Sequence, residues 1–85
     1  MDETALIQRY IDVQADRSLD GRADARLRDY GVPIWALIGQ WQALEGDIDI
    51  VAHDYQIPRE AVEAALAYYQ RNKKFIDARL LLNTA

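Results

Sequence analysis

The sequence predicts a mainly α fold, a small helical domain that contains a helix-turn-helix. Its 85 residues are 51% apolar and 28% charged, the composition of one globular domain near the lower size limit for a stable core. Apolar residues between positions 34 and 44 recur at helical spacing. The stretch VAHDYQIPREAVEAAL, residues 51–66, has the pattern of a short helix, a tight turn and a second helix.

The N-terminal third is the least regular part. Within residues 1–14, apolar positions 6, 7, 10 and 11 have helical spacing, whereas 11 and 13 alternate as in a strand, so either element fits. Residues 16–24, DRSLDGRAD, predict a loop, and residues 25–30 a brief extended piece. A short strand pair near the N-terminus is compatible with this reading.

The middle of the chain predicts two successive helices. Pro33 suits the first position of a helix over 33–45, and Gly46 ends it. Asp47 or Asp49 can cap the next helix, which runs to about Tyr55. The tryptophans of the first helix are expected to pack in the core.

A third helix begins at Pro58 after a turn at 56–57, with Val62, Ala65, Leu66 and Tyr69 facing inward. Residues 59–82 favour helix apart from Asn72, so one long helix and two helices are both open. The chain is thus divided into an N-terminal segment and loop (1–30), a helix-turn-helix domain (31–72) and a C-terminal helical segment for docking or dimerisation (73–85).

Several positions fit a helix-turn-helix at once. Ala52 is small enough for the point where two helices cross, and apolar residues suited to fill the angle are Val51, Tyr55, Ile57, Val62 and Ala65. Gln56 stands where DNA-binding versions often have glycine, which predicts a strained backbone. An ordinary helical hairpin packed for stability is the alternative.

Charge argues against strong DNA binding. The net charge is −4, and the first turns of the third helix carry Glu60 and Glu63 beside Arg59. Phosphate attraction supplies much of the affinity in DNA complexes, so an acidic face is repelled. If DNA is bound, Arg59 and Glu63 are the candidates for base contact. The candidates for phosphate contact are Arg71, Lys73 and Lys74, with help from Arg17, Arg22, Arg26 and Arg28 on a dimer.

The C-terminal segment has more apolar surface than a lone tail needs, which predicts docking on the protein's own core or on another chain. The candidate interface residues are Tyr68, Phe75, Ile76, Leu80, Leu81 and Leu82. Tyr68 is included because adjacent Tyr68 and Tyr69 are not both expected to face inward.

Other function classes find little support. The sequence has no cysteine, no glycine-rich phosphate loop and no convincing partner for its single histidine, His53, so we expect no enzyme, metal site or cofactor. Asp47 and Asp49 lack the glycine and glutamate that complete a calcium loop. No segment has the length of a membrane span, and the acidic N-terminus MDETALIQRY is unlike a signal peptide, so a cytoplasmic location is expected.

Residues 31–69, GVPIWALIGQW…EGDIDIVAHDYQIPREAVEAALAYY, resemble the small prokaryotic domain of unknown function 433. Val32, Pro33 and Ile34 match its Ile-Pro-Val entry into a helix, Gly46 its glycine turn, and residues 64–68 its Ala-Ala-Leu-Ala-Tyr helix. The resemblance covers a little under half of the chain. The family's Gly-Thr-Arg before the entry and its glycine-rich hairpin are absent, so no role is carried over for them.

The resemblance implies a winged-helix- or homeodomain-like helix-turn-helix and an antitoxin role in toxin–antitoxin pairs, often beside a PIN-like ribonuclease toxin. We therefore expect an antitoxin-like regulator, a homodimer that binds a toxin; whether its helix-turn-helix also binds operator DNA is left open. The rival hypothesis is a protein-interaction or dimerisation module that keeps the helix-turn-helix geometry without binding DNA.

Overall fold

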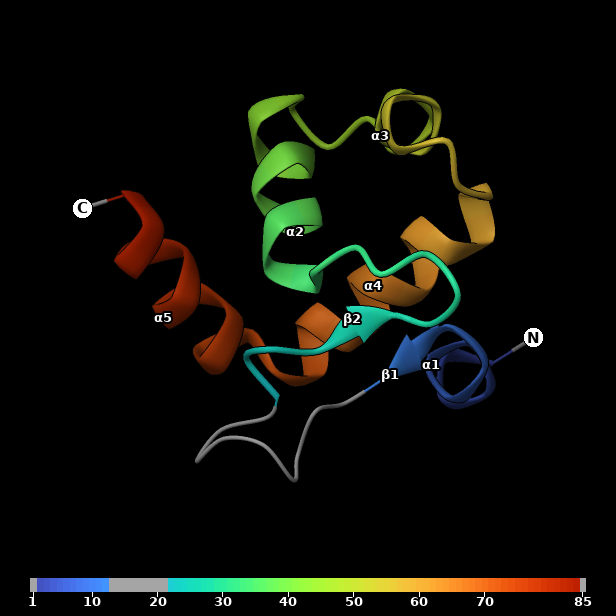
Figure 1. Ribbon diagram of the computed structural model, residues 1–85, viewed down its shortest axis with the longest axis horizontal. Coiled ribbons are helices and arrows are strands. Elements are labelled where there is room, and N and C mark those ends of the chain that lie inside the picture. The colour runs from blue at the N-terminus through green and yellow to red at the C-terminus, as the bar shows by residue number, and fades with distance from the viewer. Residues whose placement is uncertain (1, 13–21, 85) are drawn as a thin grey trace.

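The computed structural model describes residues 2–12 and 22–84, and within them it confirms the mainly α fold (Figure 1). The elements, in chain order, are α1 (Glu3–Tyr10), β1 (Ile11–Asp12), β2 (Arg26–Leu27), α2 (Ile34–Ala43), α3 (Ile48–Tyr55), α4 (Arg59–Arg71) and α5 (Lys73–Thr84). Helix α4 is the centre of the domain, because α1, α2, α3 and α5 all pack against it. No helix among the described residues is both long and apolar enough to cross a membrane.

The N-terminal region contains both of the elements that its sequence allowed. Asp2 caps α1 by accepting a hydrogen bond from the backbone N–H of Ala5 at 2.8 Å. The chain then becomes extended, and β1 pairs antiparallel with β2, with Ile11 opposite Leu27. The extended piece expected at 25–30 is thus confirmed at its start. Most of the loop expected at 16–24 lies outside the described residues.

The helix-turn-helix segment follows the predicted order closely. Helix α2 ends two residues earlier than expected, because Glu45 and Gly46 have left-handed backbones with φ of 57° and 83°. Asp47 caps α3 through its side chain, which accepts from the N–H of Ile50 at 3.1 Å. Gln56 ends α3 with φ of 56°, which confirms the strained turn. Helix α4 begins directly after Pro58.

The long C-terminal stretch is two helices. Helix α4 ends at Arg71, and Asn72 caps it: both its backbone N–H and its side-chain amide donate to the carbonyl oxygen of Tyr68, each at 3.0 Å. Helix α5 starts at the next residue and packs back against α2. The two helices approach closely at Gly39, where an added Cβ would lie 3.1 Å from Cδ2 of Leu80.

The core corrects one expectation about α4. Tyr68 and Tyr69 are both buried, at 3% and 4% exposure, although only one was expected to face inward. Other helices pack against α4 on several sides. Two adjacent side chains, which point about 100° apart around the helix axis, can therefore both be buried. Each hydroxyl still reaches a partner, the carbonyl oxygen of Arg22 at 2.7 Å and the carboxylate of Asp77 at 2.6 Å.

Candidate interaction surfaces

The start of α4 is the part of the helix-turn-helix that would meet DNA bases. Its positively charged side chain, Arg59, already forms ion pairs with two carboxylates. Arg59 contacts Asp49 of α3 at 2.6 Å and Glu63, one turn along α4, at 3.4 Å. Its hydrogen bond to Asp49 and the charges of both carboxylates raise the pKa of Arg59 above its ordinary value. Because two negative side chains surround one positive side chain, this end of α4 does not attract phosphate.

The predicted phosphate-binding cluster lies at the other end of α4. Arg71 pairs with Glu3 of α1 at 3.6 Å, and the exposed residues Lys73 and Lys74 begin α5. Arg59 and Arg71 are twelve residues apart on one helix, or about 18 Å along its axis. The structure therefore does not bring the predicted base-reading and phosphate-binding residues together.

The arginines that were expected to help with DNA make contacts within the protein. Arg22 lies over the ring of Phe75, with its guanidinium carbon 3.9 Å from the ring centre. Arg26 donates to the carbonyl oxygen of Gly31 at 2.9 Å, and Arg28 to that of Ile11 at 2.8 Å. These bonds hold the strand region in place. Arg17 lies outside the described residues.

The predicted partner interface needs correction at several positions. Ile76 and Tyr68 are buried in the protein's own core, at 0% and 3% exposure, and so have no surface for another chain. Leu80 packs against the core, and Phe75 lies half-buried beneath an arginine. Of the six predicted interface residues, only Leu81 and Leu82 near the end of α5 are exposed enough to contact another chain, at 69% and 74%. The reason is that α5 docks on α2 with one face and leaves the other uncovered.

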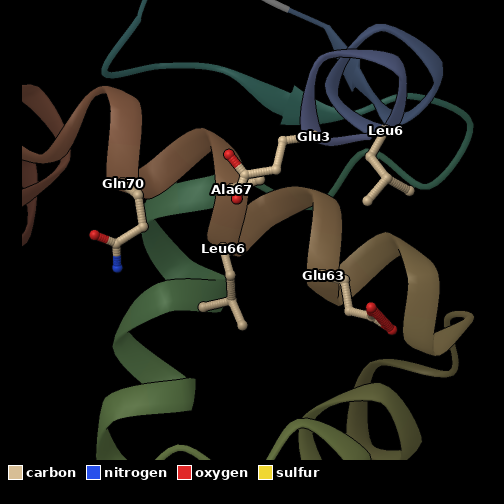
Figure 2. A pocket seen from close by; sticks show the side chains of 6 residues that line it. All are labelled: Glu3, Leu6, Glu63, Leu66, Ala67 and Gln70. Carbon is tan, nitrogen blue, oxygen red and sulfur yellow. The ribbon is translucent and has the colours of Figure 1, made fainter. Parts of the chain in front are cut away.

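A groove between α1 and the outer face of α4 was not predicted (Figure 2). It has a volume of about 270 Å³ and is lined by Glu3, Leu6, Glu63, Leu66, Ala67 and Gln70. We refer to it as the α1–α4 groove. Leu66 was expected to face inward but is only half-buried, and it lies on the same side of α4 as the groove. The spacing of Glu63, Leu66 and Gln70 marks one stripe of the helix, and α1 supplies the opposite wall.

Within residues 2–12 and 22–84, no group of three potential ligands among His, Asp and Glu gathers to hold a metal ion. His53 is exposed on α3. Burial, with help from Asp77, raises the pKa of Tyr69 to about 12, which keeps its hydroxyl protonated as a structural donor.

Comparison with known proteins adds no assignment: no family model matches the chain, and neither does any curated protein or solved structure.

Proposed function

We propose that the chain is a cytoplasmic, antitoxin-like regulator of a toxin–antitoxin pair, and that it acts chiefly by binding a partner protein. The resemblance of residues 31–69 to domain of unknown function 433 suggests this class. The observation that carries the choice of surface is the exposed pair Leu81 and Leu82 at the end of an otherwise docked helix. Apolar surface that the protein's own core leaves exposed is a candidate for contact with another protein.

Protein binding is favoured over DNA reading because of the charges at the start of α4. Asp49 and Glu63 enclose Arg59, which is the base-reading candidate. A helix-turn-helix whose base-reading arginine is enclosed by carboxylates favours the rival hypothesis, an interaction module that does not bind DNA. The proposal therefore places the toxin contact first and treats operator binding as a separate question.

The first experiment is co-purification with the product of a neighbouring small gene, above all one that encodes a PIN-like ribonuclease. We expect a complex that Leu81→Gln/Leu82→Gln disrupts. The matched control is Ile50→Gln, which replaces an apolar side chain on α3 that is 45% exposed. A complex that survives the double substitution, or no complex with the wild-type chain, would refute the proposed surface.

The second experiment measures binding to the chain's own promoter at low salt. We expect no retardation of the DNA. A salt-sensitive shift that disappears in Arg59→Ala, or in an alanine variant of Arg71, Lys73 and Lys74, would instead establish operator binding through the helix-turn-helix.

Self-association is part of the same proposal, since small domains often gain stability by pairing. Sedimentation equilibrium of the purified chain measures it directly, and we expect a homodimer. A monomer at all concentrations would remove the homodimer from the proposal without affecting the toxin contact.

A further inference from the structure

We propose that the α1–α4 groove binds a short segment of a protein partner that presents one apolar side chain between cationic side chains. The proposal concerns a second surface, separate from the exposed leucines at the end of α5. A negative result for the groove therefore leaves the proposed toxin contact intact, and a negative result for the toxin contact leaves the groove proposal intact.

The apolar part of the proposal comes from the floor of the groove. Leu6 of α1 and Leu66 of α4 are half-buried, and Ala67 between them is only 6% exposed. Figure 2 shows Leu6 on α1 and Leu66 on α4, the two helices that form the walls of the groove. A volume of about 270 Å³ accommodates side chains of a partner but not the width of a whole helix. An apolar side chain placed there would remove both leucines from water.

The cationic part comes from the rim, where two carboxylates already accept guanidinium groups. Glu3 pairs with Arg71 at 3.6 Å, and Glu63 pairs with Arg59 at 3.4 Å. All four side chains are between 44% and 63% exposed, so these ion pairs are screened by water and contribute little to stability. An arginine or lysine of a partner can join or replace them, and the amide of Gln70 offers a further hydrogen bond.

Two other occupants fit less well. A DNA phosphate would meet a rim around which three carboxylates, those of Glu3, Glu63 and Asp49, outnumber the two arginines that they pair with, and the excess negative charge repels it.

A second copy of this chain would have to present apolar and cationic side chains close together. Its exposed leucines end α5, where the neighbouring Arg79 already pairs with Asp24 at 3.9 Å and lies over the ring of Trp35. Lys73 and Lys74 begin the same helix, about 10 Å away along its axis.

The experiment titrates ¹⁵N-labelled full-length protein with a five-residue peptide that has one central leucine flanked on each side by arginines. We expect saturable NMR shifts concentrated at the backbone amides of Leu6, Leu66, Ala67 and Gln70. The same peptide with glutamates in place of the arginines is expected to cause none. Glu3→Gln/Glu63→Gln is expected to weaken binding about fivefold, because two exposed charge pairs with the peptide are lost.

The matched control is Glu45→Gln/Asp54→Asn, which removes the same charge from exposed positions outside the groove. Binding by this variant is expected to equal that of the wild type, with circular dichroism confirming that both variants fold. Equal weakening in the two variants, shifts spread over α3, or no shift at millimolar peptide would each overturn the proposal. Shifts at the groove caused by protein concentration alone would assign it to a second copy, and shifts caused by a short DNA duplex to nucleic acid; either result would also overturn it.

Discussion

Truncation of Ile76 tests whether α5 is an integral part of the domain. Ile76 is fully buried on α5, whereas Leu82 on the same helix is 74% exposed. The substitutions Ile76→Ala and Leu82→Ala each remove about three side-chain carbons, so they differ mainly in burial. The comparison therefore isolates what the docked face of α5 contributes.

The expected magnitudes follow from that burial. Three fully buried carbons contribute about 2.4 kcal/mol of transfer free energy, and the cavity that remains brings the expected cost of Ile76→Ala to about 3 kcal/mol. About a quarter of Leu82 is buried, which scales the same transfer term to about 0.6 kcal/mol. The difference between the two variants is therefore expected to exceed about 2 kcal/mol.

Urea denaturation followed by far-ultraviolet circular dichroism measures both free energies by linear extrapolation. Tryptophan fluorescence provides a second probe, because Arg79 of α5 lies 5.4 Å from the ring centre of Trp35 on α2. Ile76→Ala is also expected to lower the melting temperature by more than 10 °C, at about 4–8 °C per kcal/mol. If Ile76→Ala costs less than about 1 kcal/mol, or no more than Leu82→Ala, the docking of α5 on the core is refuted.

Three further predictions concern local features. Burial raises the pKa of Tyr69 to about 12, so above about pH 10 the unfolded chain loses this proton first and the free energy of unfolding falls as pH rises. In Tyr69→Phe the free energy of unfolding, measured by urea titration at each pH, is expected to fall less steeply between pH 10 and 12. An equal fall in the variant and the wild type would contradict this prediction. Gln56→Gly is expected to raise the free energy of unfolding by about 0.5–1 kcal/mol by removing the cost of a side chain in a left-handed turn, and a loss of stability would count against that strain. Asp47→Ala is expected to lower it by about 1 kcal/mol through loss of the α3 cap, whereas Asp49→Ala, which breaks only an exposed ion pair, should change it by less than about 0.5 kcal/mol; equal effects would contradict the cap.

Features that depend on neighbouring residues were predicted well from the sequence. The order of α2, α3 and α4 and the left-handed turn at Gln56 follow from interactions within a few residues, and so does the α3 cap, which the sequence narrowed to Asp47 or Asp49 and the structure assigns to Asp47. Local signals at Asn72 left the choice between one helix and two open. That choice depended on whether the segment after Asn72 could pack back against α2, which is a long-range contact.

The candidate interface was predicted less well, because burial of an apolar residue depends on what covers it. Phe75–Leu82 has many apolar residues, but their number does not indicate which ones meet the core. Docking of α5 on α2 covers Ile76 and Leu80 and leaves the last two leucines of the segment exposed. The sequence therefore identified an interacting segment without separating its inner face from its outer face.

The α1–α4 groove had no signal in the sequence beyond the stripe that includes Glu63 and Leu66. Its two walls, α1 and α4, are about sixty residues apart in the chain, and β2 and α2 are among the elements that separate them in sequence. Only the packing of α1 along α4 brings Glu3 and Leu6 to that stripe. The pairing of Glu3 with Arg71 depends on the same packing.

The sequence by itself determined the helical class, the helix-turn-helix order and the acidic character of the start of α4, because spacing, turn residues and charge act over short distances. The tertiary structure decided which charges and apolar side chains remain available to partners. It joined Arg59 to Asp49 across the turn, buried Ile76 and Tyr68, and formed a groove beside α4. These outcomes depend on contacts between distant segments, which residue spacing does not specify.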